Sequence, residues 1–201
     1  MNIPAQAFPA QNQWDLLVEH RVHYEFHGLW VECEDPEELR RLLRADAGSR
    51  LDCDLEGAVG TYPGPPEMVV WIGPHAPGWT HVLAFGMDPY RLGVINLGKR
   101  RVFEIHCDEE LGRLDPLYLY YDGEQLGHVT PPYEEGGYME FPDYRPYASG
   151  LALGEGAGLE HDIHLMLCMV GRITGRFLDR EWFASTRTAY RIPEGTWDEP
   201  W

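Results

Sequence analysis

Apolar positions along the chain repeat at helical spacing near its C-terminal end. Between Leu159 and Ile173 the apolar residues are three or four positions apart, which places them on one face of a helix. Gly175 follows directly, and glycine is the usual residue just after a helix because it adopts the left-handed conformation easily. The pattern therefore predicts a helix over 159–174 with one buried face.

A second helix is indicated by its start signal rather than by its length. Asp35 occupies the position of an N-cap, Pro36 the first helical position, and Glu38 the position of a capping-box partner. Leu39, Leu42 and Leu43 then form an apolar face. We expect a short helix that begins after Asp35 and ends before Gly48.

Between residues 57 and 130 the pattern changes to short apolar runs separated by glycine and proline. Three pairs of such runs predict successive hairpins: 68–73 with 80–86, 94–98 with 100–106, and 117–121 with 124–130. Asp122-Gly123, between the last two, is favoured in two-residue hairpin turns. Hairpins without intervening helices predict an antiparallel sheet. The expected fold class is α+β, an antiparallel sheet of successive hairpins with two main helices packed on one face.

The remaining segments complete a single domain over residues 1–201. Part of 14–34 is expected to be a strand, and 178–185 a short third helix. Residues 131–158 hold prolines, glycines and tyrosines without sustained periodicity, which predicts a long loop or flap. Residues 186–201 are interpreted as a tail.

Charge narrows the classes of partner. Thirty-three acidic residues against 16 basic ones give a net charge of −17, which disfavours nucleic acid and anionic membranes as direct partners. Residues 1–100 carry 14 acidic and 8 basic residues, and residues 101–201 carry 19 and 8. The C-terminal half therefore holds most of the excess, and a basic protein is the expected partner.

The cysteines and the apolar runs bear on location. Cys33, Cys53, Cys107 and Cys168 are widely spaced and form no Cys-x-x-Cys pair, which favours reduced, buried thiols in a cytoplasm. No apolar run approaches the roughly 20 residues that span a bilayer. Arginine supplies 15 of the 16 basic residues, which is typical of a GC-rich bacterial genome.

Histidine offers a candidate metal site. On the predicted C-terminal helix, His161, His164 and Cys168 share one face, and imidazole and thiolate are good transition-metal ligands. A second group is formed by His20, His23 and His27. These groups are the basis of an alternative reading as a metal-dependent enzyme, although no His-Glu-x-x-His and no Gly-x-Ser-x-Gly motif is present. We prefer the simpler interpretation that these histidines are surface or half-buried residues and that the protein has no cofactor.

Aromatic residues among carboxylates form the preferred binding site. Tyrosine and tryptophan dominate binding hot spots, and charge complementarity speeds encounter with a basic surface. The alternative is that these aromatics only cover the core. The candidate binding residues are Trp79, Tyr133, Glu134, Glu135, Tyr138, Glu140, Asp143, Tyr144 and Tyr147.

These observations favour a non-enzymatic protein-binding domain, similar in role to bacterial immunity proteins or inhibitors that block a basic toxin or nuclease. Besides the metal-dependent enzyme, a defence or anti-defence accessory that mimics the charge of DNA is a further alternative. It requires carboxylates at roughly phosphate spacing along one surface.

Four short motifs resemble an uncharacterised domain of unknown function that is common in actinobacteria. The motifs are Pro-Glu-Glu-Leu at 36–39, Gly-Trp at 78–79, Asp-Gly at 122–123 and Arg-Ile-Thr-Gly at 172–175. The likeness covers about residues 14–185, and the aromatic loop 131–150 departs from it. The resemblance implies a bacterial source and a fold, and no catalytic residues.

Overall fold

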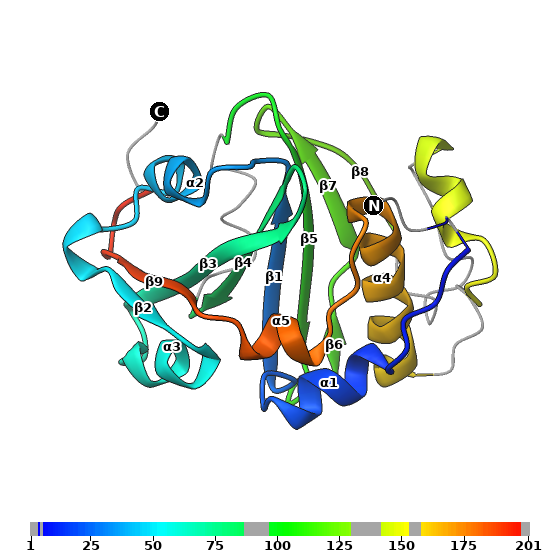
Figure 1. Ribbon diagram of the computed structural model, residues 1–201, viewed down its shortest axis with the longest axis horizontal. Coiled ribbons are helices and arrows are strands. Elements are labelled where there is room, and N and C mark those ends of the chain that lie inside the picture. Colours follow the sequence, from blue (N-terminus) through cyan, green and yellow to red (C-terminus); the bar gives the residue numbers. More distant parts are fainter. Residues whose placement is uncertain (1–3, 5, 87–96, 130–141, 153–157, 198–201) are drawn as a thin grey trace.

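The computed structural model describes residues 4, 6–86, 97–129, 142–152 and 158–197. Its centre is a nine-stranded antiparallel sheet in the order β2-β9-β3-β4-β1-β5-β7-β8, with β6 paired to β5 (Figure 1). The strands are β1 (Glu25–Val31), β2 (Leu51–Cys53), β3 (Met68–Ala76), β4 (Trp79–Phe85), β5 (Arg101–Asp108), β6 (Arg113–Leu114), β7 (Leu117–Tyr121), β8 (Glu124–Val129) and β9 (Arg187–Ile192). The predicted α+β class and antiparallel sheet are confirmed.

Four of the five α-helices of the described residues begin after a residue whose side chain caps them, and α4 begins after Gly158 without a side-chain cap. The helical elements are α1 (Gln13–Glu19), α2 (Pro36–Leu42), η1 (Ala47–Ser49), α3 (Leu55–Thr61), η3 (Pro142–Ala148), α4 (Leu159–Thr174) and α5 (Arg180–Ala184). At the start of α2 the Asp35 carboxylate accepts a hydrogen bond from the backbone N–H of Glu37 at 2.9 Å. Gly175 ends α4 in the left-handed conformation with φ of 87°. The predicted start of α2 and both predicted ends of α4 are therefore confirmed, whereas α2 already ends at Leu42 and Gly48, its predicted stop, lies in η1.

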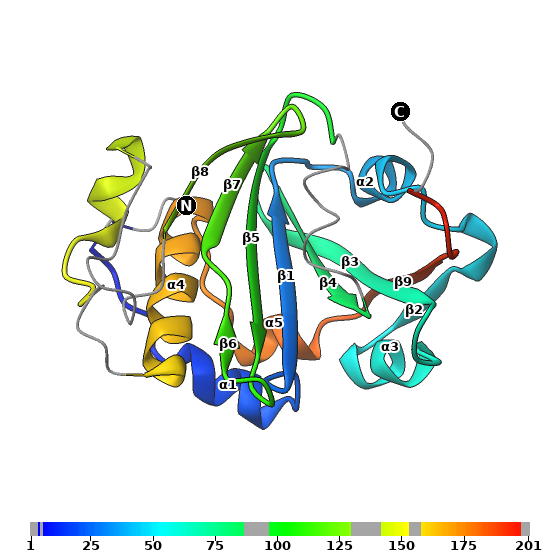
Figure 2. The same ribbon diagram turned by 180° about the vertical axis from the view of Figure 1, so that it is seen from behind.

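The helices are divided between the two faces of the sheet, which corrects the prediction that they share one. On β1, Phe26 and Trp30 face a core formed with α1, α3, α4 and α5. Leu29 and Val31 face the opposite way, into a second core with Leu39 of α2. Figures 1 and 2 show α1, α4 and α5 against one face. Because alternate strand residues point to opposite faces, both faces of β1 carry apolar side chains and each needs its own cover. We call these the α4 face and the α2 face.

The first and third of the three hairpin predictions are confirmed. β3 pairs with β4, and β7 pairs with β8. Asp122 and Gly123 have φ of 55° and 79°, the left-handed values that a two-residue hairpin turn requires. The predicted middle hairpin is wrong: β5 pairs with β1 along one edge and with β7 along the other. Leu97 and Gly98 are not in a strand, and residues 94–96 lie outside the described residues.

The largest difference from the sequence prediction is β9. Residues 187–192, expected to belong to a tail, form a strand between β2 and β3. Ala189 contributes to the core of the α4 face, whereas Tyr190 and Ile192 contribute to that of the α2 face. This alternation is the strand signal, and it was missed because only six residues carry it. Within the predicted loop 131–158, residues 142–148 form η3.

Two helical glycines provide a stability test of this packing. A Cβ atom on Gly171 of α4 would clash with Cδ1 of Phe177 and lie 3.1 Å from the carbonyl oxygen of Arg176. We expect Gly171→Ala to lower the free energy of unfolding by about 1–2 kcal/mol through overpacking. On Gly60 of α3 a Cβ atom would meet nothing within 4 Å. Gly60→Ala should therefore raise the free energy of unfolding by about 0.5–1 kcal/mol. Urea titration of both variants measures whether their free energies of unfolding change in these opposite directions.

Candidate functional site

The predicted acidic and aromatic site is only partly described by the structure. Five of its residues lie outside the described residues: Tyr133, Glu134, Glu135, Tyr138 and Glu140. The other four lie on two elements. Trp79 is at the start of β4, and η3 contains Asp143, Tyr144 and Tyr147. Their surroundings decide whether they are surface anchors or part of the core.

The described aromatics of this site pack against the core of the α4 face. Trp79 is 7% exposed, and its ring centroid is 5.8 Å from that of Phe103, which in turn is 5.4 Å from that of Tyr144. The Tyr144 hydroxyl lies 3.2 Å from Nη1 of Arg101, and Tyr147 is a neighbour of Tyr144 at 6.2 Å. Trp79 and Tyr144 both lie against Phe103. Trp79 is part of this core, and Tyr144 and Tyr147 are half-buried against it.

The histidine and cysteine group on α4 does not form a metal site. Nδ1 of His164 accepts a hydrogen bond from the backbone N–H of Gln13 at 3.1 Å. Burial raises the pKa of Cys168 to about 12, which keeps its thiol protonated at neutral pH. In the described parts of the chain no group of three or more His, Cys, Asp or Glu side chains could hold a metal ion.

The three early histidines lie in separate environments. His20 stacks on Phe183 of α5 with ring centroids 4.2 Å apart. Nε2 of His23 lies 3.5 Å from Oε2 of Glu109. His27 is on β1, on the α2 face, where its Nε2 is 2.7 Å from Oε1 of Glu104. The sequence placed them together, but the turn between α1 and β1 directs them to different elements.

His27 belongs to a polar patch whose members are far apart in the sequence. Cross-strand pairing sets His27 opposite His106 on β5, Glu104 opposite Tyr118 on β7, and Tyr118 opposite His128 on β8. These residues therefore share the α2 face, next to its apolar core. We call His27, Glu104, His106, Asp115, Tyr118 and Tyr120 the polar patch.

Two histidine–carboxylate pairs form the centre of the polar patch. The first is His27 with Glu104, each 1% exposed. In the second, Nδ1 of His106 is 2.8 Å from Oδ2 of Asp115, whose Oδ1 also accepts from Arg113. The His27 and His106 rings lie edge to face, 5.3 Å apart. Burial and the charge of Glu104 raise the pKa of Tyr120. Such pairs fix the orientation of each ring.

A different kind of surface lies where β1 begins and β5 ends. The backbone N–H of Glu109 donates to the carbonyl of Tyr24 at 3.1 Å, and that of Leu111 donates to Oδ1 of Asp108 at 3.0 Å. Tyr24 is 54% exposed and Leu111 73%. Glu25 is the cross-strand partner of Asp108. We call Tyr24, Glu25, Asp108, Glu109, Glu110 and Leu111 the acidic end.

The acidic end joins exposed apolar groups to carboxylates, the combination that was predicted for the 131–150 loop. Figures 1 and 2 show the turn between β5 and β6 beside the start of β1 and α1. Pairing of β1 with β5 creates it, and the sequence gives no sign of that pairing. Only the adjacent acids at 108–110 followed by Leu111 signal an exposed apolar residue in an acidic turn.

Membrane and family comparisons add no assignment. Within the described ranges no helix is both long and apolar enough to cross a bilayer. No protein-family model matches the chain, no curated protein matches it, and no solved structure matches it. The resemblance to an actinobacterial family of unknown function therefore remains a prediction.

Proposed function

We propose that this protein is a non-enzymatic binding domain that recognises a basic protein partner, as bacterial immunity proteins and inhibitors do. The observation that carries the proposal is the acidic end, where exposed Tyr24 and Leu111 lie among four carboxylates. Aromatic and aliphatic anchors supply the buried contact, and the carboxylates attract the partner.

The distribution of arginine supports a basic rather than an acidic partner. Many arginines of the described residues already pair with carboxylates inside the protein, so they do not offer charge to a partner. The arginines in such ion pairs are Arg40, Arg50, Arg100, Arg101, Arg113, Arg176, Arg180 and Arg191. Arg172 and Arg187 are buried. The net charge of −17 is therefore expressed mainly by carboxylates at the surface.

The proposed surface differs from the one that the sequence favoured. Trp79 and Tyr144 pack against the core, so they are poor candidates for anchors. Tyr24 takes their place. The four free cysteines agree with a reducing compartment, and we propose a bacterial cytoplasm as the location.

Tyr24 gives the sharpest test of the proposal. We expect Tyr24→Ala to weaken binding of the partner by about 2 kcal/mol or more, the loss that defines a hot spot. The matched control is Tyr121→Ala, because Tyr121 is also exposed, at 38%, and lies in the β7–β8 hairpin at the other end of the sheet. Each variant would be used to capture partners from the native host at low salt, and the affinity of the purified partner would then be measured across a salt series.

Three results are expected from that experiment. A partner must be recovered with wild-type protein and with Tyr121→Ala, its binding must be weaker with Tyr24→Ala, and its affinity must fall as salt screens the carboxylates. Equal binding by both tyrosine variants, or an affinity that ignores salt, would contradict the proposed site.

A further inference from the structure

An open hollow lies at the edge of the sheet that β2 and β9 form. β2 pairs only with residues 187–189 of β9. η1 lies beside the next part of that strand, where the N–H of Asp46 donates to the carbonyl of Arg191. The hollow has a volume of about 520 Å³, which is within the range of sites for small organic ligands. Its lining residues include Asp46, Ser49, Arg50, Leu51, Ala189 and Arg191, and we call it the arginine hollow.

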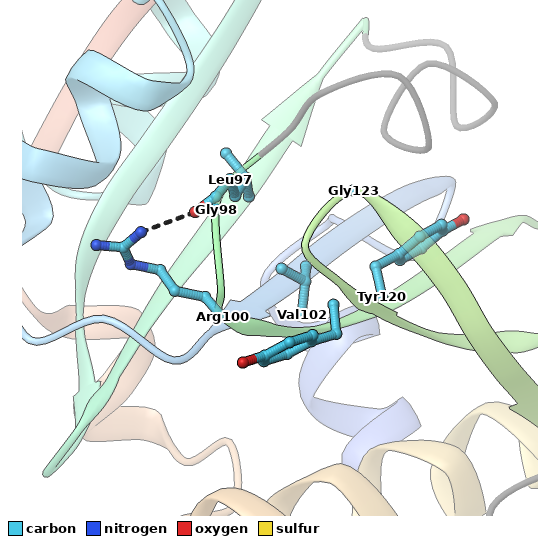
Figure 3. Close-up of a pocket in the computed structure, with 7 residues that line it drawn as sticks. Leu97, Gly98, Arg100, Val102, Tyr120 and Gly123 are labelled. Atoms are coloured by element: carbon cyan, nitrogen blue, oxygen red, sulfur yellow. Dashed lines mark hydrogen bonds between the residues drawn. The ribbon is translucent and has the colours of Figure 1, made fainter.

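A second hollow, beside Tyr120, is too small for such a ligand. Figure 3 shows it with Arg100 donating a hydrogen bond to the carbonyl of Leu97. Its volume is about 10 Å³, which is room for about one water molecule. Arg100 also pairs with Glu38, so its guanidinium already has partners within the protein. Size and free donors therefore favour the arginine hollow as a ligand site.

In the arginine hollow the backbone of Arg191 is fixed, whereas its guanidinium has no hydrogen-bond partner. The backbone N–H donates to Oγ of Ser49 at 2.8 Å, and the carbonyl accepts from the N–H of Asp46 at 2.8 Å. Among the described residues, the one contact of the guanidinium is with Glu67 at 3.6 Å, which is longer than a hydrogen bond. A guanidinium has five N–H donors, and those of Arg191 are available to a ligand.

Arg50 brings a second guanidinium to the lining. Its Nη2 donates to both carboxylate oxygens of Asp52 at 3.2 Å. The ion pairs of Arg50 and Arg191 are exposed, with each side chain more than 40% accessible, and such pairs contribute only about 0–1 kcal/mol. They cancel the charge that a distant protein would meet. Exchanging them for a ligand in direct contact costs little.

The charges of the arginine hollow favour a carboxylate over a phosphate. Its lining holds two arginines and one acidic residue, Asp46, and the carboxylates of Asp52 and Glu67 lie next to the arginines. A doubly charged phosphate would be repelled by these acids more than a singly charged carboxylate. The planar fork of a guanidinium also matches a carboxylate with two parallel hydrogen bonds. Leu51, which is 42% exposed, and its cross-strand partner Ala189 add an apolar wall.

We propose that the arginine hollow binds a small organic carboxylate with an apolar body. Arg191 and Arg50 hold the carboxylate, and Leu51 packs against the body of the ligand. The arginine hollow shares no residue with the acidic end, so the failure of one site leaves the other untouched.

The test uses benzoate as the probe and benzamide as its neutral counterpart of nearly the same shape. Spectra of the arginine Nε–H groups would be recorded during each titration. We expect a saturable shift of the Arg191 signal with benzoate and none with benzamide, because the neutral amide lacks the charge that strengthens these hydrogen bonds. No saturable shift with benzoate, or an equal shift with benzamide, would overturn the proposal. Tighter binding of phenyl phosphate than of benzoate would overturn the choice of a carboxylate.

Variants locate the binding. Arg191→Gln removes the free guanidinium and should weaken benzoate binding by about tenfold or more. Arg41→Gln is the matched control, because Arg41 is an exposed arginine of α2 outside the hollow, and it should bind benzoate like the wild type. If Arg191→Gln does not fold, Arg50→Gln replaces it and should weaken binding by about threefold or more. Unchanged affinity in folded Arg191→Gln, or in Arg50→Gln when it takes that place, would show that the probe binds elsewhere.

The apolar wall has its own variant. Leu51→Ala removes most of the apolar side chain and leaves both arginines in place, so benzoate should bind about threefold more weakly. The same titration measures this loss. An affinity equal to that of the wild type would contradict the packing of the ligand body against Leu51.

Discussion

Replacing Arg172 with alanine is expected to lower the free energy of unfolding by about 2–4 kcal/mol. Arg172 is 2% exposed, and it donates hydrogen bonds to the carbonyls of Ala7, Tyr147 and Ser149 at 2.7, 2.7 and 2.8 Å. Its guanidinium also lies 4.7 Å from the ring centroid of Phe8. One side chain of α4 thus holds the N-terminal segment and the end of η3. Its removal leaves three carbonyls without a donor and releases both segments.

Urea unfolding and hydrogen exchange would measure this effect. Arg172→Lys should retain only part of the stability, because an ammonium lacks the planar fork that reaches several carbonyls at once. Arg41→Ala, at an exposed position of α2, is the control and should change stability by less than about 0.5 kcal/mol. Faster exchange is expected near residue 7 and near residues 147–149. A loss of stability without local loss of protection there would contradict the anchoring role of Arg172.

The elements predicted correctly from sequence are those whose signals are local. The cap at Asp35, the apolar spacing up to Ile173 with Gly175 as its stop, and the Asp122-Gly123 turn each lie within a few residues. β9 was missed because its short alternation gains meaning only between β2 and β3. The division of helices between two faces was also missed, because it depends on which strand residues point toward which helix.

The candidate sites show the same limit more strongly. Glu104 is 77 residues from His27 in the chain, and only the pairing of β1 with β5 brings them together. His106 and Asp115 are closer in sequence, yet they meet because the chain turns back after β5. For Tyr24, exposure depends on where α1 ends and β1 begins. Sequence spacing alone cannot supply these contacts.

A second buried cluster, on the α4 face, determines how the protein responds to acid. His75 is 3% exposed and His81 0%. The ring of His81 lies 4.5 Å from Trp30 and 4.7 Å from Trp182, and among the described residues neither of its nitrogens has a hydrogen-bond partner. Arg187, between Trp71 and Trp182, adds a buried positive charge nearby. Protonation of either histidine is therefore strongly disfavoured in the folded state.

Stability is consequently expected to fall as the pH drops below about 6.5, the pKa of histidine in an unfolded chain. Burial, with the charges of Arg187 and Arg176, lowers the pKa of His75 to about 3. Burial likewise lowers the pKa of His81 well below its usual value. Below pH 6.5 the unfolded state binds protons that the folded state does not bind. The stability that neutral His75 contributes is therefore fully present above pH 6.5 and is lost progressively down to about pH 3. For His75 alone the loss between pH 7 and 4.5 is about 2–3 kcal/mol.

His81→Phe isolates one part of this response. A phenyl ring keeps the contacts with Trp30 and Trp182 and removes two buried nitrogens, so the free energy of unfolding at pH 7 should rise by about 1 kcal/mol. The fall in stability with acid should become shallower by about 1.4 kcal/mol per pH unit below pH 6, the contribution of one proton. Urea titrations from pH 7.5 to 4.5 measure both quantities. His161→Gln, at a half-buried position in the first turn of α4, is the control and should leave the slope unchanged.

The same slope in His81→Phe as in the wild type would show that His81 takes up no additional proton on unfolding. The acid response would then have to come from His75 and from carboxylates held by arginine, such as Glu32 beside Arg101, whose pKa is lowered.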